Sequence, residues 1–146
     1  MRKRYLKIAV VLLCFLMLCS ISTHAYAVEP YASSQISAHS ATLKKGTDGY
    51  LYVTFTISTN RVMNTLGASS VVIQRYSFFQ WVNEHTITPD DMPELLTTNE
   101  GYHALIVRYT PLFSNAKYRA VVNLYAKSDT MTSTVTETTN TVPKST

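Results

Sequence analysis

Apolar and polar residues alternate along most of the chain beyond residue 34, and helical periodicity is nearly absent. The clearest segment is Tyr50–Ile57, YLYVTFTI, in which Leu, Val, Phe and Ile fall on one face and Tyr and Thr on the other. Aromatic and β-branched residues suit a half-buried pleated surface. Because the turn signal Gly46–Gly49 directly precedes this segment, the pattern predicts a strand that packs one face against a core.

This alternation predicts seven strands, at residues 35–43, 50–57, 70–76, 80–88, 102–110, 117–127 and 132–138. The side chains expected to point inward include Ile36, Ala38, Leu51, Val53, Phe55, Ile57, Val71, Ile73, Leu105, Val107, Tyr109, Tyr118, Ala120, Val122 and Leu124. The Thr-rich last strand is expected at a sheet edge, and Gly67–Ser70 is expected to be a loop. Strands this short and this closely spaced predict an all-β fold, a single immunoglobulin-like β-sandwich of about seven antiparallel strands.

A local motif sharpens this prediction. Tyr118 is followed two residues later by Ala120, in the Y-x-small-x-V pattern of the tyrosine corner of immunoglobulin-like and fibronectin type III-like domains. Ala120 occupies the inward position that holds cysteine in antibody domains. We expect the Tyr118 phenol to hydrogen-bond a backbone group of Pro111–Asn115. The alternative is that Tyr118 is an ordinary tyrosine at the edge of the core.

Several segments together resemble a known group of proteins. They are AYAVEPYASSQIS, LYVTFTI, LGASS, the I-Q-R-Y…W strand pair and YRAVVNLYAK, and they cover nearly the whole chain. The chain resembles an uncharacterised family of small secreted proteins from Gram-positive bacteria. The resemblance implies a β-sandwich and carries no assigned activity. In hairpins such as the one predicted here, the turn is usually rich in Gly or Asn, whereas this chain has Ser77-Phe78-Phe79, which argues against a tight two-residue turn.

The first 27 residues have the layout of a secretory signal peptide. A basic start precedes an apolar run of eleven residues, Ile8–Leu18, and Ala25-Tyr26-Ala27 is a small-x-small cleavage signal. The predicted boundaries are therefore a signal peptide at 1–27, a loose lead at 28–34, a β-sandwich domain at 35–139 and a flexible tail at 140–146. An uncleaved anchor would need about 20 apolar residues, and lipidation of Cys19 would need a small residue in place of Leu18.

Removing this leader changes what the charge implies. It contains four of the 13 basic residues and none of the nine acidic ones, so the remaining chain carries nine of each. A neutral chain without a basic run supplies no field for nucleic acid, and by the same argument we expect no membrane partner. Both cysteines, Cys14 and Cys19, lie in the leader. The cysteine-free secreted domain must therefore be held by its core alone, and a thiol nucleophile is excluded.

The sequence offers no clear catalytic, cofactor or metal motif. His39, His85 and His103 lack the close spacing that places two metal ligands on one element. The loop Pro89–Glu94 contains Asp90, Asp91 and Glu94, which are oxygen ligands of a kind that suits calcium. It lacks the alternating arrangement of a calcium loop, so we interpret it as a solvated loop and leave calcium binding open. We expect no catalytic residue, no cofactor and no metal.

The strongest functional signal is a cluster of aromatic residues. Tyr76, Phe78, Phe79 and Trp81 lie within six residues around a presumed hairpin turn, where polar residues are usual. Exposed aromatics mark partner surfaces. Tyr50, Tyr52 and Tyr125 are candidates to extend an outward-facing set. The alternative is structural: Trp81 anchors the core and the two phenylalanines cap one open end of the sandwich.

We therefore expect a secreted, extracellular binding module without enzymatic activity, whose partner is an extracellular protein or a cell-envelope glycan. The candidate partner-binding residues are Tyr76, Phe78, Phe79, Tyr50 and Tyr52, and the candidate structural residues are Tyr118, Ala120 and Trp81. One alternative is a structural subunit of a surface assembly joined through edge strands. Another is a hydrolase with an unrecognised site, and a toxin or inhibitor is a further possibility. The sequence does not define the oligomeric state.

Overall fold

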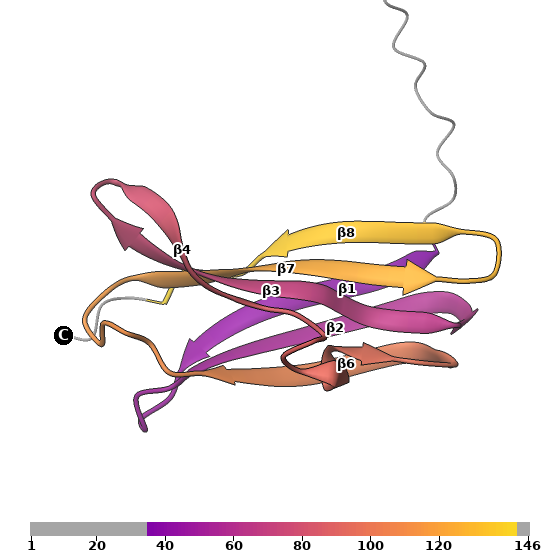
Figure 1. Ribbon diagram of the computed structural model, residues 1–146, viewed down its shortest axis with the longest axis horizontal. Helices are drawn as coiled ribbons and strands as arrows, with labels where there is room; N and C mark the ends of the chain where they lie inside the picture. Colours follow the sequence, from indigo (N-terminus) through magenta and orange to yellow (C-terminus); the bar gives the residue numbers. More distant parts are fainter. Residues whose placement is uncertain (1–34, 143–146) are drawn as a thin grey trace, which may run out of the picture. The chain divides into compact units, whose positions relative to one another are not determined.

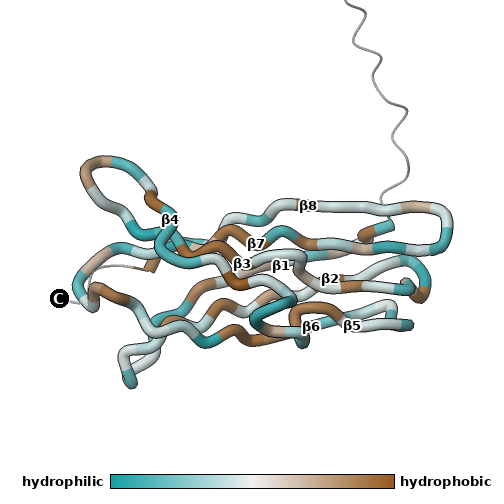
Figure 2. The backbone as a smooth tube through the Cα atoms, viewed as in Figure 1, coloured by the Kyte–Doolittle hydropathy of each residue, from teal (hydrophilic) through white to brown (hydrophobic). Residues whose placement is uncertain are grey.

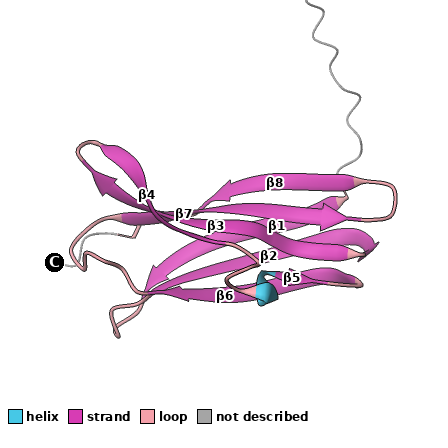
Figure 3. Ribbon diagram, in the orientation of Figure 1, coloured by secondary structure: helices cyan, strands magenta, loops and turns pink. Residues whose placement is uncertain are grey.

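Eight strands and one short helical turn form the fold of the protein in a computed structural model, which describes residues 35–142 (Figures 1 and 3). The strands are β1 (Ile36–Lys45), β2 (Leu51–Met63), β3 (Thr65–Ser77), β4 (Gln80–Ile87), β5 (Leu96–Thr97), β6 (Glu100–Tyr109), β7 (Tyr118–Lys127) and β8 (Thr132–Thr138). The turn is the 3₁₀ segment η1 (Pro93–Leu95). No helix within the described range is long and apolar enough to cross a bilayer. The predicted leader and lead lie outside the described residues.

The strands form two antiparallel sheets. β1, β2 and β6 are neighbours in that order in a three-stranded sheet. In the five-stranded sheet the order is β4, β3, β7 and β8, and β5 also pairs with β3. The all-β sandwich expected from the alternation is therefore confirmed, and each of the seven predicted strands overlaps an observed one.

The core lies between the sheets and is filled from alternate positions of the strands. Along β2, Val53, Phe55 and Ile57 are fully buried, and the threonines between them face outward. β7 repeats the pattern, since every second residue from Tyr118 to Ala126 is buried. Burial of such side chains supplies most of the stability of a domain without cross-links.

Two predictions about individual positions are wrong. Ala38 was expected to face the core but is exposed, because a β-bulge between Ile36 and Ala38 shifts the alternation of β1 by one residue. Residues Gly67–Ser70 were expected to be a loop but lie within β3, which carries a second bulge between Ala68 and Ser70. Bulges add one residue to a strand, and the apolar pattern alone does not reveal them.

The segment expected as a tail from residue 140 onward begins with ordered contacts. The Asn140 side chain accepts a hydrogen bond from the backbone N–H of Leu43 and donates one to its carbonyl, both at 2.9 Å. Val142 exchanges backbone hydrogen bonds with Tyr118. Asn140 therefore satisfies backbone groups at the outer edge of β1, where they would otherwise invite pairing with another chain. Residues 143–146 lie outside the described range.

Gly67 is required where β5 approaches β3. Its φ is +147°, and a Cβ added to it would overlap the Leu95 carbonyl. We expect Gly67→Ala to lower the free energy of unfolding by at least about 2 kcal/mol, because the side chain would push η1 and β5 away from the sheet. Urea denaturation measures this loss. The matched control is Gly101→Ala, whose Cβ would lie 3.6 Å from its nearest neighbour, and equal stability of the two variants would contradict the prediction.

Candidate binding surface at the hairpin end

The β3–β4 hairpin extends beyond the other strands at one end of the sandwich and carries apolar residues at its tip (Figures 1 and 2). Ser77 pairs with Gln80, so only Phe78 and Phe79 form the turn. Their φ angles are +48° and +64°, and their side chains are 92% and 95% exposed. The turn is therefore tight, contrary to the sequence-based doubt, and neither phenylalanine caps the core.

The outer face of the hairpin carries Tyr76 and Trp81, which lie opposite each other across the two strands. Their rings make an edge-on contact with centroids 5.2 Å apart. The guanidinium of Arg119 lies 4.3 Å from the centroid of the Trp81 ring. Trp81 is half-buried and is absent from the buried core cluster. It therefore braces the outer face of the hairpin through aromatic and cation–π contacts.

A second apolar group faces the hairpin from the loop between β6 and β7. Phe113 lies under the Arg75 guanidinium at 4.3 Å and is 53% exposed, and Leu112 is 72% exposed. Nine large apolar side chains are exposed between residues 35 and 142, and six of them gather here: Tyr76, Phe78, Phe79, Val82, Leu112 and Phe113. Leu112 and Phe113 were not predicted from the sequence, although an apolar pair in a predicted loop is the same kind of signal as Phe78-Phe79.

The base of the hairpin is held by a buried carboxylate, Glu84, whose side chain is 4% exposed. One of its oxygens accepts hydrogen bonds from the phenols of Tyr109 and Tyr118 and from the Leu112 backbone, at 3.0–3.1 Å. The other oxygen accepts from Arg75 Nε at 2.8 Å. Because β6 belongs to the opposite sheet, the Glu84 carboxylate joins both sheets to the hairpin and to the β6–β7 loop.

Glu84 faces inward because the β3–β4 ladder is irregular at this point. The register shifts between Ile73 and Gln74, so Glu84 stands at an extra position of β4 between His85 and Asn83. A strand read as QWVNEHTI gives no sign of this shift. A lone Glu beside an Arg on the partner strand is the signal that would have suggested a buried pair.

The phenols beside Glu84 are displaced from their ordinary ionisation. Burial, reinforced by the nearby carboxylate, raises the pKa of Tyr109 from 10.0 to about 12. Burial also raises the pKa of Tyr118 to about 12, although its hydrogen bond from the Phe113 backbone acts in the opposite direction. Both phenols therefore stay protonated at neutral pH and donate to Glu84.

Tyr118 also makes the loop contact that the sequence predicted. Its hydroxyl accepts a hydrogen bond from the Phe113 N–H at 3.2 Å, within the expected range Pro111–Asn115. The side chain is 2% exposed, and Ala120 is fully buried on the same face. Tyr118 thus positions the loop that carries Phe113 as well as packing into the core.

Tyr50 and Tyr52 lie at the same end of the sandwich but at the β1–β2 turn. Arg108 covers the Tyr50 ring at 3.4 Å, and the Tyr52 hydroxyl donates to Asp48. This hydrogen bond is the main cause of the lowered pKa of the Asp48 carboxyl. Both tyrosines are half-buried, so they are less available to a partner than the hairpin phenylalanines.

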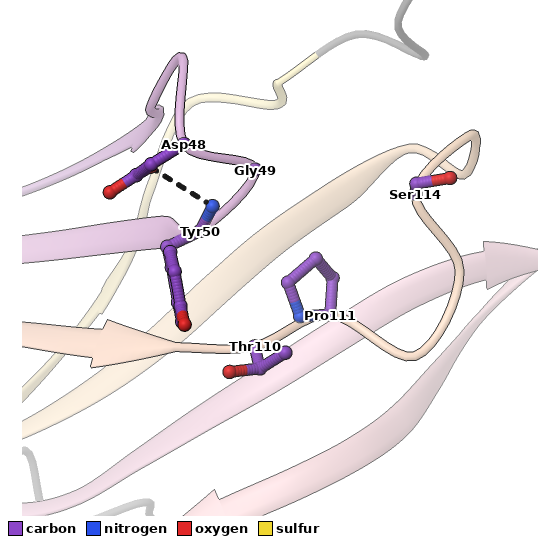
Figure 4. A pocket seen from close by; sticks show the side chains of 6 residues that line it. All are labelled: Asp48, Gly49, Tyr50, Thr110, Pro111 and Ser114. Carbon is purple, nitrogen blue, oxygen red and sulfur yellow. Dashed lines mark hydrogen bonds between the residues drawn. The ribbon is translucent and has the colours of Figure 1, made fainter.

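A pocket of about 210 Å³ lies between this turn and the β6–β7 loop (Figure 4). It is lined by Asp48, Gly49, Tyr50, Thr110, Pro111 and Ser114. Ligand pockets for drug-sized molecules usually measure about 300 Å³ or more. The lining offers one carboxylate and no neighbouring base, so the pocket has no acid–base pair of the kind that hydrolysis uses.

The three histidines make different contacts, and one of them reaches the acidic loop. His39 pairs with Glu137 at 2.6 Å, His85 stacks on Tyr109, and His103 bonds the Glu94 carbonyl. The Asp91 carboxylate accepts from the backbone and hydroxyl of Thr88, and these bonds lower its pKa. Between residues 35 and 142 no three His, Cys, Asp or Glu side chains gather to hold a metal ion.

Tyr125, the further candidate for the outward-facing set, lies apart from the hairpin. Tyr125 pairs with Gly67 and Thr134 near the far end of β7, whereas Tyr76 lies opposite Trp81 at the hairpin. Tyr125 is also half-buried. The structure thus brings together Tyr76, Phe78 and Phe79 of the candidate set and leaves Tyr125 outside it.

No protein-family model and no curated protein matches this chain. Among solved structures, the chain is similar to the solution structure of a candidate late embryogenesis abundant (LEA) protein. That similarity has a TM-score of 0.38 and 12% sequence identity, and it covers 74% of this chain and 73% of the other. The resemblance to a family of small secreted Gram-positive proteins stays a prediction.

Removing the Tyr118 hydroxyl tests the carboxylate network. We expect Tyr118→Phe to lower the free energy of unfolding by about 1–3 kcal/mol, because Glu84 loses a donor and the Phe113 N–H loses its acceptor. Chemical denaturation measures the change. Tyr102→Phe, at an exposed tyrosine of β6, is the control, and an unchanged stability of Tyr118→Phe would show that the phenol is not structural.

The raised tyrosine pKa values predict a loss of stability at alkaline pH. Below pH 10.0 both phenols are protonated in the folded and the unfolded chain, so their contribution is fully present. As the pH rises from 10.0 to about 12, the unfolded chain loses these protons first and stability falls. Urea denaturation across this range measures the fall. Tyr109→Phe should make it shallower, and an identical profile for that variant would contradict the assignment.

Proposed function

We propose that the protein is an extracellular, non-enzymatic interaction module that binds its partner through the hairpin end. The observation that carries the proposal is the nearly complete exposure of Phe78 and Phe79 at a projecting turn. Contiguous exposed apolar residues mark interaction sites on folded proteins. The extracellular location rests on the leader-like first 27 residues, and the partner is an extracellular protein or a cell-envelope glycan.

The turn conformation supports a functional reason for these two residues. Both have positive φ, a region that costs an ordinary L-residue about 1–2 kcal/mol. Asn-Gly is the usual solution for such a two-residue turn, because both residues adopt positive φ readily. Two phenylalanines therefore weaken the hairpin and add no core packing, and strain of this kind concentrates at functional sites.

We also propose that the sandwich is of the fibronectin type III-like kind. The supporting features are the three-stranded sheet β1-β2-β6, the association of β4 with β3, β7 and β8, and the Tyr118 bond across the β6–β7 corner. Domains of this architecture commonly present binding residues on loops at the ends of the sandwich. Fold alone assigns no partner.

The double substitution Phe78→Asn and Phe79→Gly separates binding from folding. We expect it to raise the free energy of unfolding by about 1 kcal/mol or more, because both new residues suit the turn. We expect the same variant to lose most of its capture of envelope and culture components by tagged residues 28–146. Thermal denaturation and affinity capture measure the two effects.

The matched control replaces Tyr102 and Ile106 with Ser on the outer face of β6, where these side chains are 57% and 62% exposed. It removes a comparable apolar area away from the hairpin and should leave capture unchanged. Undiminished capture by the hairpin variant would exclude the tip as the binding site. Concentration-dependent self-association in sedimentation, with no partner captured, would favour the surface assembly instead.

A further inference from the structure

Most basic residues of the described fold lie at its hairpin end. The hairpin end comprises the β1–β2 turn, the β3–β4 turn, the β6–β7 loop and the strand residues next to them. It carries six basic residues, Lys44, Lys45, Arg75, Arg108, Lys117 and Arg119, against Asp48 and Glu84. The rest of residues 35–142 carries Arg61 and Lys127 against Asp90, Asp91, Glu94, Glu100, Asp129 and Glu137. The hairpin end is therefore at +4 and the remainder at −4.

A partner that approaches the hairpin end meets this local surplus. β7 has ten residues, which at about 3.3 Å each separates the two ends by about 30 Å. The screening length at 0.1 M salt is about 10 Å. Glu100 and Asp129 at the far end therefore do not cancel the basic residues near the hairpin. Glu137, opposite Val122 at the middle of β7, is four residues or about 13 Å along the strand from Tyr118, still beyond one screening length. The zero net charge of the whole thus does not describe the binding surface.

We propose that the hairpin end docks on an anionic lipid bilayer, with Phe78 and Phe79 inserted between the headgroups and the acyl chains. This inference rests on the proposed function, in which the hairpin tip is the binding site. It replaces the expected protein or glycan partner, and the sequence-based expectation of no membrane partner, with a lipid surface. The tip is convex, and both side chains are exposed over more than nine-tenths of their area. A deformable surface accepts such a shape without a preformed pocket, and a basic rim on the protein complements anionic headgroups.

The basic residues are placed to accompany insertion. The Tyr76 N–H bonds the Lys117 carbonyl at 2.9 Å, so Lys117 is beside the hairpin, and its side chain is exposed. Lys44 and Arg108 are also exposed, on the neighbouring β1–β2 and β2–β6 pairs. In interfacial membrane segments, apolar residues enter the bilayer and basic residues behind them contact the headgroups. The phenylalanines of the tip and the lysines behind it have the same arrangement.

The aromatic face fits a stacked sugar less well. A sugar platform needs an open ring face, and Arg119 covers one face of Trp81 while the Tyr76 edge contacts the same ring. Tyr50 is covered in the same manner by Arg108. The most exposed rings at this end are those of Phe78 and Phe79, which carry no hydrogen-bonding group for hydroxyls. The observations therefore favour a lipid surface over a glycan.

The test is co-sedimentation of purified residues 28–146 with vesicles of phosphatidylcholine alone and of phosphatidylcholine with phosphatidylglycerol. The thermal transition first verifies that every variant is folded. We expect the protein to bind the anionic vesicles. This binding should weaken in roughly 0.5–1 M salt, because the screening length there falls to a few ångströms. Phe78→Asn with Phe79→Gly should weaken it by at least about tenfold.

Charge reversal supplies the second arm. Lys44→Glu with Lys117→Glu should weaken vesicle binding by about tenfold or more, because each basic residue near an anionic surface contributes about a factor of five. The matched control, Arg61→Glu with Lys127→Glu, changes the net charge equally at the far end and should have little effect. Equal losses in the two variants would overturn the docking orientation.

The outcomes for this inference and for the proposed function are distinguishable. If no vesicle is bound while capture of an envelope component still requires Phe78 and Phe79, the lipid inference is wrong and the interaction module stands. Binding to neutral and anionic vesicles alike would overturn the role of the basic rim. If neither vesicles nor envelope components are retained, both proposals fail.

Discussion

The Glu84 carboxylate is the interaction on which the arrangement of this end of the molecule depends. A buried charge is stable only when its oxygens are fully engaged, and here the donors come from four places: Arg75 on β3, Tyr109 on β6, Tyr118 on β7 and the backbone of the β6–β7 loop. β3 and β7 belong to one sheet and β6 to the other, so the carboxylate fixes the hairpin relative to both sheets. It does so without a disulfide, because residues 28–146 contain no cysteine.

The hairpin that carries the exposed tip is supported on both of its faces. Trp81 and Arg119 brace the outer face of the hairpin, Arg75 and Phe113 brace the inner face, and the turn beyond them carries only Phe78 and Phe79. A strained, solvent-exposed pair on a firmly held support loses little conformational freedom on binding, which is the condition under which apolar contacts contribute most to affinity. In the proposed docking, the local charge surplus orients the same end toward an anionic surface.

The strand pattern predicted the architecture because burial on one face imposes a period of two, which the sequence displays directly from Leu51 to Ile57 and from Tyr118 to Leu124. The direction of side chains could not be predicted at the β-bulges, because each bulge shifts the alternation by one residue. The bulge in β1 turned Ala38 outward, and the irregularity opposite Gln74 turned Glu84 inward. The bulge in β3 interrupted the alternation at Gly67–Ser70, so that this part of the strand was not predicted. The aromatic tip was predicted because it breaks the rule that turns are polar, whereas the charge separation depends on strand order, which no local pattern contains.

The contact between Asn140 and Leu43 joins residues 97 positions apart. A side chain that imitates a neighbouring strand thus closes the edge of β1 only after almost all of the chain is available. During synthesis, β1 and β2 would pair early while that edge stayed open to foreign strands. Protection of the β1 edge by Asn140 is therefore the last step in completing this sheet, however early its strands pair.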